Sequence, residues 1–115
     1  DYYMERLRGK ETEEVILVMT DNKNRLICDR TLSKGTVNCS LVSPRGIFLM
    51  AMEYHAVHIL LIHNHPSGDA SPSRQDIEIT KHLAQLCGMM QLPLTDHIIV
   101  GDNCYVSFRE SGLLK

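Results

Sequence analysis

The stretch that decides the fold covers residues 57 to 76 and joins the segments "VHILLI" (57–62) and "HNHPSGDASPSRQD" (63–76). The first segment is apolar at nearly every position, which predicts a central strand covered on both faces of a sheet. The second segment is a run of imidazoles, carboxylates, serines, prolines and a glycine. Two interpretations compete for it: a loop that ends in a helix cap, or a metal site.

The segments on either side complete an α/β pattern. Two predicted helices each begin with a serine N-cap, Ser43 before Pro44 and Ser73 before Arg74, and run to about residues 56 and 90. The predicted strands share an apolar and β-branched character between turn residues, and they are 13–20, 25–33, 35–42, 57–62, 92–101 and 104–108. This order predicts one α/β domain with a mixed β-sheet flanked by helices.

The composition is that of an ordinary globular domain. The chain has 115 residues, of which 43% are hydrophobic and 23% are charged, and the net charge of −2 gives no support for a surface that binds a nucleic-acid backbone. We expect a single domain over residues 1–115, with residues 1–12 forming the end of an upstream helix or linker. Such a chain is long enough to bury one core without disulfides.

The cysteines and the hydropathy pattern predict a cytoplasmic protein with no membrane partner. The cysteines at 28, 39, 87 and 104 form no C-x-x-C pair, so we expect small buried hydrophobes in a reducing compartment. The sequence has neither a secretory signal nor an apolar run of about 18 residues. The sequence leaves the oligomeric state open.

His63 and His65 form the centre of the predicted metal site. Residues two apart in an extended chain point to the same face, so both imidazoles can converge on one point at the end of the central strand. Asp76 follows in the first turn of the next helix, after a loop that contains one glycine and two prolines. Two histidines and one carboxylate with an open fourth position are the ligand set of a catalytic zinc.

Two questions stay open on spacing alone. Ser73 and Asp76 also fit a capping pattern at a helix start, which needs no metal. A metal hydrolase further requires a general base, and Glu13 and Glu14 are the candidates at the start of the first strand. Only one of them can face the site, because neighbouring strand residues point to opposite faces, and chemistry alone does not choose between them.

The spacing of these residues resembles a known signature. His63-x-His65, seven residues, Ser73, two residues and Asp76 match the JAMM motif of the MPN-plus metalloprotease fold without a gap. The whole string 63–76 closely resembles the RadC family, as do "TDNKNRLI", "GTVNCSLVSPRGIF", "LTDHIIVG" and "YVSFRESGLL". The resemblance covers the chain from about residue 13.

The resemblance implies a fold, a cofactor and a role for each site residue. It implies the cytidine-deaminase-like architecture of JAMM domains and a Zn²⁺ held by His63, His65 and Asp76, with a water as fourth ligand. It selects Glu13, eight residues before Asp21 of the turn, as the group that takes the proton of the water. It implies that the hydroxyl of Ser73 helps to hold the developing oxyanion.

Two functions follow as hypotheses. The first is a zinc-dependent hydrolase that cleaves peptide or isopeptide bonds, which implies a peptide or protein substrate. The second is a DNA-repair-associated accessory domain with a structural or vestigial metal, with DNA bound through regions outside this chain. Glu13 discriminates between them, since a structural metal site needs no base.

Three further polar residues carry weaker predictions. Asn64 must point away from its two histidine neighbours, so we expect an anchoring amide rather than a ligand. Asp96 and His97 precede the apolar run "IIVG". They are either a pair that orients a metal ligand or a structural hydrogen bond at a strand start.

Overall fold

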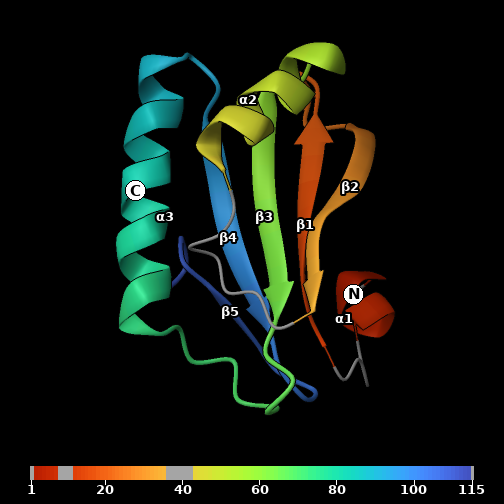
Figure 1. The fold of residues 1–115 in the computed structure, drawn as a ribbon, viewed down its shortest axis with the longest axis vertical. Helices are drawn as coiled ribbons and strands as arrows, with labels where there is room; N and C mark the ends of the chain where they lie inside the picture. Colours follow the sequence, from red (N-terminus) through yellow and green to blue (C-terminus); the bar gives the residue numbers. More distant parts are fainter. Residues whose placement is uncertain (1, 8–11, 36–42, 115) are drawn as a thin grey trace.

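The computed structural model describes residues 2–7, 12–35 and 43–114. It contains helices and strands in the order α1 (Tyr2–Leu7), β1 (Glu13–Thr20), β2 (Leu26–Gly35), α2 (Pro44–Glu53), β3 (His58–Asn64), α3 (Arg74–Met89), β4 (Leu94–Val100) and β5 (Tyr105–Ser107). Figure 1 shows the strands as one sheet with the helices around it. The N-terminal segment expected to end a helix or linker forms α1 over residues 2–7.

The sheet is mixed, as the sequence predicts. Among the described residues it has five strands in the order β2-β1-β3-β4-β5. β3 and β4 are parallel and are connected through α3, whereas β1 is antiparallel to β2 and to β3, and β5 is antiparallel to β4. The α/β class with a mixed sheet flanked by helices is therefore confirmed. Residues 36–42 of the predicted third strand lie outside the described residues.

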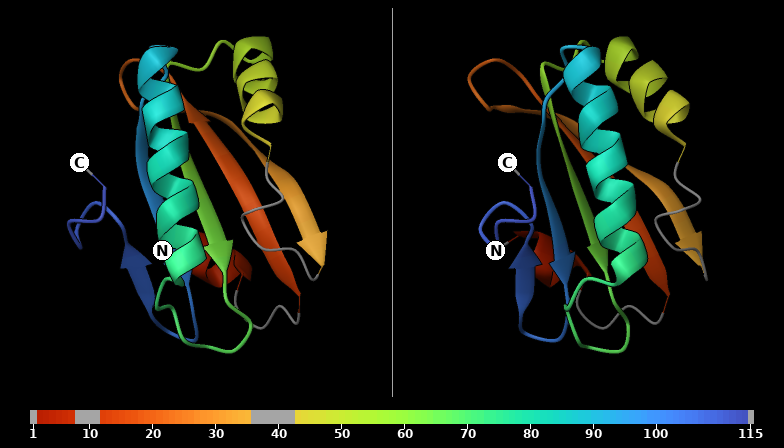
Figure 2. Two further views of the ribbon diagram at one scale, coloured as in Figure 1. Left: turned by 60° about the vertical axis from the view of Figure 1, so that its left-hand side comes forward. Right: turned by 90° about the vertical axis from the view of Figure 1, so that its left-hand side faces the viewer.

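The two faces of the sheet are covered by different helices. α2 and α3 lie on one face and α1 lies on the other, as both views of Figure 2 show. In β1, Val15 and Leu17 belong to the cluster that packs with α2 and α3, whereas Ile16 and Val18 belong to the cluster around Leu7 of α1. The central strands are thus buried on both sides, which explains their continuous apolar sequence.

Both predicted serine caps are present. The side chain of Ser43 accepts a hydrogen bond from the backbone nitrogen of Gly46 at 3.3 Å, with Pro44 in the first turn of α2. α2 ends earlier than predicted, at Glu53, and His55 adopts a φ of 56° just beyond it. A left-handed residue closes a helix because it turns the chain away from the helical path.

The prediction that the cysteines are buried holds for one of them and is wrong for another. Cys87 is fully buried in the core, and burial raises the pKa of its thiol to about 11. Cys104 is exposed in the turn before β5. Within the part of the chain that the structure describes, no helix has the length and apolar character needed to span a membrane.

Candidate metal centre

Strand register brings Glu13, His63 and His65 to one end of the sheet. Val15 of β1 pairs with His63 of β3 in an antiparallel register, so the start of β1 lies beside the end of β3. The odd-numbered residues of both strands face α3, as the core clusters show. Glu13 therefore points to the same face as the two histidines, and Glu14 points to the opposite face.

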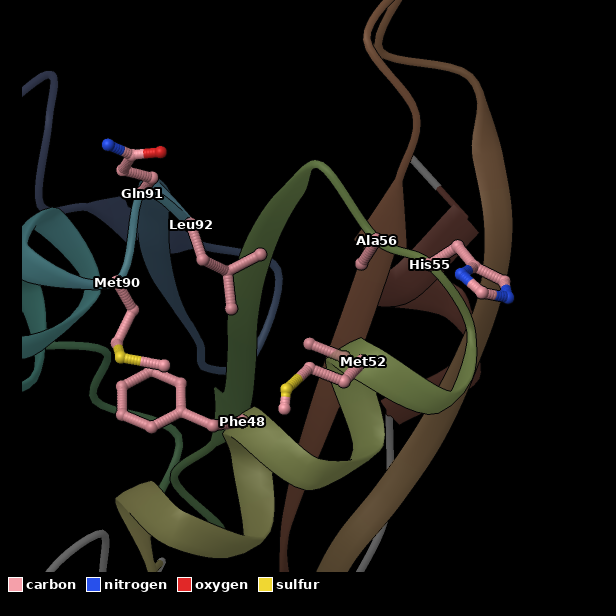
Figure 3. Close-up of a pocket in the computed structure, with 8 residues that line it drawn as sticks. Phe48, Met52, His55, Ala56, Met90, Gln91 and Leu92 are labelled. Atoms are coloured by element: carbon pink, nitrogen blue, oxygen red, sulfur yellow. The ribbon is translucent and has the colours of Figure 1, made fainter.

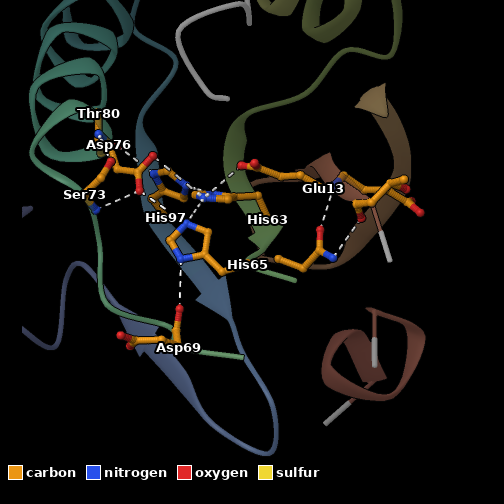
Figure 4. Close-up of polar contacts among 11 residues, drawn as sticks. Glu13, His63, His65, Asp69, Ser73, Asp76, Thr80 and His97 are labelled. Atoms are coloured by element: carbon orange, nitrogen blue, oxygen red, sulfur yellow. Dashed lines mark hydrogen bonds and ion pairs between the residues drawn. The ribbon is translucent and has the colours of Figure 1, made fainter. Parts of the chain in front are cut away.

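The donor atoms of this cluster lie close to one another (Figure 4). Nε2 of His63 and Nε2 of His65 are 3.1 Å apart. Oε1 of Glu13 lies 3.7 Å from Nε2 of His63, and one ligand atom from each of these three residues lies within 4.8 Å of the others. Asp76 completes the group, with Oδ1 at 3.9 Å from Nε2 of His63 and Oδ2 at 3.4 Å from Nε2 of His65.

Asp76 is held by the start of α3. Ser73 is the N-cap of α3, and its Oγ accepts a hydrogen bond from the backbone nitrogen of Asp76 at 2.9 Å. In return, Oδ2 of Asp76 accepts a hydrogen bond from the backbone nitrogen of Ser73 at 2.9 Å. This carboxylate therefore closes a capping box and also faces both imidazoles, so its capping role leaves room for the predicted role as a metal ligand.

The electrostatics of His63 and Asp76 suit a cation. Burial lowers the pKa of His63 to about 4, so its ring is neutral at pH 7. The pKa of His65 is raised, chiefly by its hydrogen bond to Asp76. Burial alone would raise the pKa of Asp76, but hydrogen bonds from His65 and from the backbone of Ser73 lower it below its usual range. A neutral imidazole and an ionised carboxylate are the protonation states in which these side chains bind zinc.

Glu13 differs from Asp76 in how it is held. Its side chain is 20% exposed, compared with 5% for Asp76. Burial raises the pKa of Glu13, and the nearby imidazole of His65 opposes the shift. A carboxylate with a raised pKa beside a cluster of donor atoms has the properties of a proton acceptor.

Asn64 anchors the strand that carries Glu13. Its Oδ1 accepts a hydrogen bond from the backbone nitrogen of Glu14 at 2.6 Å, and its Nδ2 donates to the backbone oxygen of Thr12 at 3.1 Å. The prediction of an anchoring amide is confirmed. The amide ties the start of β1 to the end of β3, and it thereby fixes Glu13 beside the histidines.

His65 and its loop are held by the β4–β5 turn. The backbone nitrogen of His65 donates to Val100 at 2.9 Å, and its Nδ1 lies 3.0 Å from the backbone oxygen of Asp69. Because a carbonyl only accepts, this contact leaves the Nε2 of a neutral His65 ring to face the cluster. The backbone nitrogen of Asp102 donates to the backbone oxygen of Gly68 at 2.9 Å and so fixes the middle of the loop.

His97 touches the cluster and Asp96 does not. Nε2 of His97 lies 2.7 Å from Nδ1 of His63. The carboxylate of Asp96 instead accepts hydrogen bonds from the backbone nitrogens of His97 and Arg109 and from the hydroxyl of Ser107. The two predicted alternatives therefore divide between the neighbours: Asp96 makes structural hydrogen bonds, and His97 contacts a predicted ligand. Sequence reasoning missed Thr80, whose Oγ1 lies 2.6 Å from Nδ1 of His97.

A separate hollow of about 320 Å³ lies at the other end of the sheet. Figure 3 shows its lining, in which Phe48 and Met52 of α2 face Met90 and Leu92. Leu92 lies shortly before β4, whereas the histidine cluster lies at the carboxyl end of β3. Its lining includes His55 but no carboxylate, and among the described residues the group with metal-binding geometry is that of Glu13, His63 and His65.

The fold and this cluster define an α/β domain with a candidate metal site of imidazoles and carboxylates at the carboxyl end of a central strand. Comparison with protein-family models identifies the family: residues 1–113 match the model described as a RadC-like JAB domain. The chain belongs to this family.

Relatives with high identity to the chain carry the name UPF0758 protein. The chain is 42% identical to one from Syntrophotalea carbinolica over 113 residues, which cover 98% of this chain and 50% of the relative. It is 44% identical to one from Clostridium perfringens over 111 residues, 96% of this chain and 49% of the relative. The chain thus spans about half the length of these curated relatives.

Proposed function

We propose that this domain is a zinc-dependent hydrolase that cleaves peptide or isopeptide bonds with an activated water molecule. The observation that carries the proposal is that two differently held carboxylates, those of Glu13 and Asp76, border the paired imidazoles of His63 and His65. His63, His65 and Asp76 would hold the zinc. Zinc bound by three protein groups supplies polarisation of the substrate carbonyl and a lowered pKa for a bound water.

In this proposal the remaining residues move and stabilise charge. Glu13 takes a proton from the attacking water, since its carboxylate borders the same cluster and burial has raised its pKa. Ser73 is exposed at the N-cap, and its hydroxyl oxygen already accepts a hydrogen bond from the backbone of Asp76. Its own hydrogen is then available to a carbonyl oxygen that becomes negatively charged.

A paired substitution tests the proposal. Glu13→Gln keeps the shape of the side chain but cannot take a proton, so hydrolysis should fall by roughly 10²–10⁴-fold while zinc remains bound. Glu14→Gln is the matched control, because it makes the same chemical change on the opposite face of β1. Hydrolysis should survive this control even where stability changes.

The assay uses quenched fluorescent peptides and a lysine isopeptide, with zinc content measured on the same samples. Loss of zinc in Glu13→Gln would show that Glu13 is a ligand rather than a base. Full activity in that variant, or a wild-type protein with bound zinc that cleaves neither substrate, would refute the proposal.

A further inference from the structure

A buried hydrogen-bonded chain leads away from the cluster into the core. It runs from His63 through His97 to Thr80, with ring-to-ring and ring-to-hydroxyl contacts of 2.7 and 2.6 Å. The first two residues are fully buried, and Thr80 is 1% exposed. Burying these polar groups costs free energy because they lose their hydrogen bonds to water, so each of them needs a hydrogen-bond partner in the protein.

The chain has two possible proton arrangements, and only one leaves His63 able to bind a metal. In the first, Nδ1 of His63 donates to Nε2 of His97, whose Nδ1 in turn donates to Oγ1 of Thr80. His63 then has a lone pair on Nε2, the nitrogen that faces the cluster. In the second arrangement every donor and acceptor is reversed, and Nε2 of His63 carries a hydrogen instead.

We propose that His97 and Thr80 are positioning residues that hold His63 in the first arrangement, with its Nε2 lone pair directed at the cluster. This inference rests on the metal site in the proposed function. His65 needs no such partner, because its Nδ1 faces a backbone carbonyl that can only accept. His63 faces another imidazole, which can donate or accept, so the next group along the chain decides.

Thr80 supplies the acceptor that the first arrangement needs. It lies one helical turn after Asp76 in α3, and its Oγ1 lies 2.6 Å from Nδ1 of His97, so its hydroxyl oxygen can accept the hydrogen of that nitrogen. Phe108 supports the geometry, because its ring stacks on His97 with centroids 4.6 Å apart and planes at 18°.

Two substitutions interrupt the hydrogen bonds from His63 through His97 to Thr80 at different points. His97→Phe keeps an aromatic ring against Phe108 but removes the acceptor for Nδ1 of His63. Thr80→Val keeps the shape of the side chain and removes the hydroxyl, and Thr80→Ser restores it. Thr95→Val is the matched control, since its hydroxyl donates to the backbone oxygen of Ile59 rather than to an imidazole.

The experiment titrates each EDTA-stripped protein with Co²⁺ alone and follows the absorption of the bound metal. His97→Phe and Thr80→Val should each weaken Co²⁺ binding by roughly 10–100-fold. This is the typical loss when a residue that hydrogen-bonds a metal-binding histidine is replaced. Thr80→Ser and Thr95→Val should stay within about threefold of wild type. Melting temperatures of the stripped proteins report folding separately, and Thr80→Val decides the outcome if His97→Phe does not fold.

Ring ¹⁵N shifts of the stripped proteins supply a readout that a merely structural role would not move. Thr80→Val should change the distribution of the ring hydrogen of His63 between Nδ1 and Nε2, whereas Thr95→Val should leave it as in the wild type. An unchanged distribution in Thr80→Val, full Co²⁺ affinity in both His97→Phe and Thr80→Val, or a wild-type protein that binds no Co²⁺ would overturn the inference. Co²⁺ binding in the expected order without hydrolysis of any substrate would sink only the proposed function.

Discussion

Removal of the hydroxyl of Ser73 should measure the helix cap that holds Asp76. In Ser73→Ala, the backbone nitrogen of Asp76 loses its acceptor at 2.9 Å, whereas the reciprocal bond from the backbone of residue 73 to the carboxylate can persist. Loss of a serine N-cap costs about 1 kcal/mol. The entropy of unfolding for 115 residues is about 0.24 kcal/mol/K, so the melting temperature should fall by about 4 °C.

The matched variant is Ser43→Ala at the start of α2. Ser43 also caps a helix through its hydroxyl oxygen, but its contact with Gly46 is longer, at 3.3 Å, and lies outside the histidine cluster. Its loss of stability should be similar or smaller, with metal affinity unchanged. In Ser73→Ala, Co²⁺ affinity should fall together with stability, because the cap fixes the carboxylate.

The assay is thermal unfolding of both stripped variants, followed by Co²⁺ titration and peptide hydrolysis. An unchanged melting temperature in Ser73→Ala, beside a clear loss in Ser43→Ala, would refute the capping argument. Should hydrolysis collapse at unchanged stability and unchanged metal affinity, Ser73 acts on the substrate oxygen alone.

Two other features of the fold give predictions of defined sign. In Gly101→Ala the new methyl group would overlap the backbone oxygen of Gly68, so the free energy of unfolding should drop by about 1–3 kcal/mol and Co²⁺ affinity should fall. Gly88 has open space around it, so Gly88→Ala should instead stabilise α3 by about 0.5–1 kcal/mol, measured by urea unfolding. Burial opposes ionisation of Asp29, but hydrogen bonds that include one from Arg6 at 2.9 Å lower its pKa. The wild type should therefore be more stable than Asp29→Asn by about 1 kcal/mol in the free energy of unfolding at pH 7. This difference should be complete above pH about 4 and shrink as the pH falls further. Equal stability of the two proteins at pH 7 would contradict this prediction.

The site was predictable where it depends on strand periodicity. The two-residue spacing of His63 and His65 and the position of Asp76 after a serine cap are local patterns, and the structure brings all three together. Periodicity also separated Glu13 from Glu14 as lying on opposite faces, although only the resemblance said which face holds the site. The family assignment confirms that resemblance.

The contact of His63 with His97 was not predictable in the same way. The two residues are 34 positions apart and lie on neighbouring parallel strands, where His63 pairs with Ile99. A parallel register depends on the crossover through α3 rather than on any local pattern, so the sequence could mark His97 as a candidate but could not place its ring. Thr80 lies on the buried face of α3 with Leu83 and Cys87, and nothing in the helical periodicity reveals that its hydroxyl meets an imidazole.

The proposed function makes one carboxylate the metal ligand and the other the base, and distance alone does not assign these roles, since Glu13 and Asp76 lie 3.7 and 3.9 Å from the same nitrogen of His63. The way each is held separates them. Asp76 is fixed by a capping box in the absence of any metal and has a lowered pKa, so it presents an ionised carboxylate with little freedom to lose on binding. Glu13 has a raised pKa and more exposure, which suits a group that takes up and releases a proton.

Metal affinity should therefore fall unequally when each carboxylate becomes an amide. Asp76→Asn removes the charge of a proposed ligand. It should weaken Co²⁺ binding by more than the roughly 10–100-fold that is typical when a residue that only hydrogen-bonds a ligand is replaced. Glu13→Gln should leave the affinity nearly unchanged, because a base that contacts only water contributes little to binding. Equal losses in the two variants would mean that both carboxylates bind the metal, and the division between ligand and base would have to be abandoned.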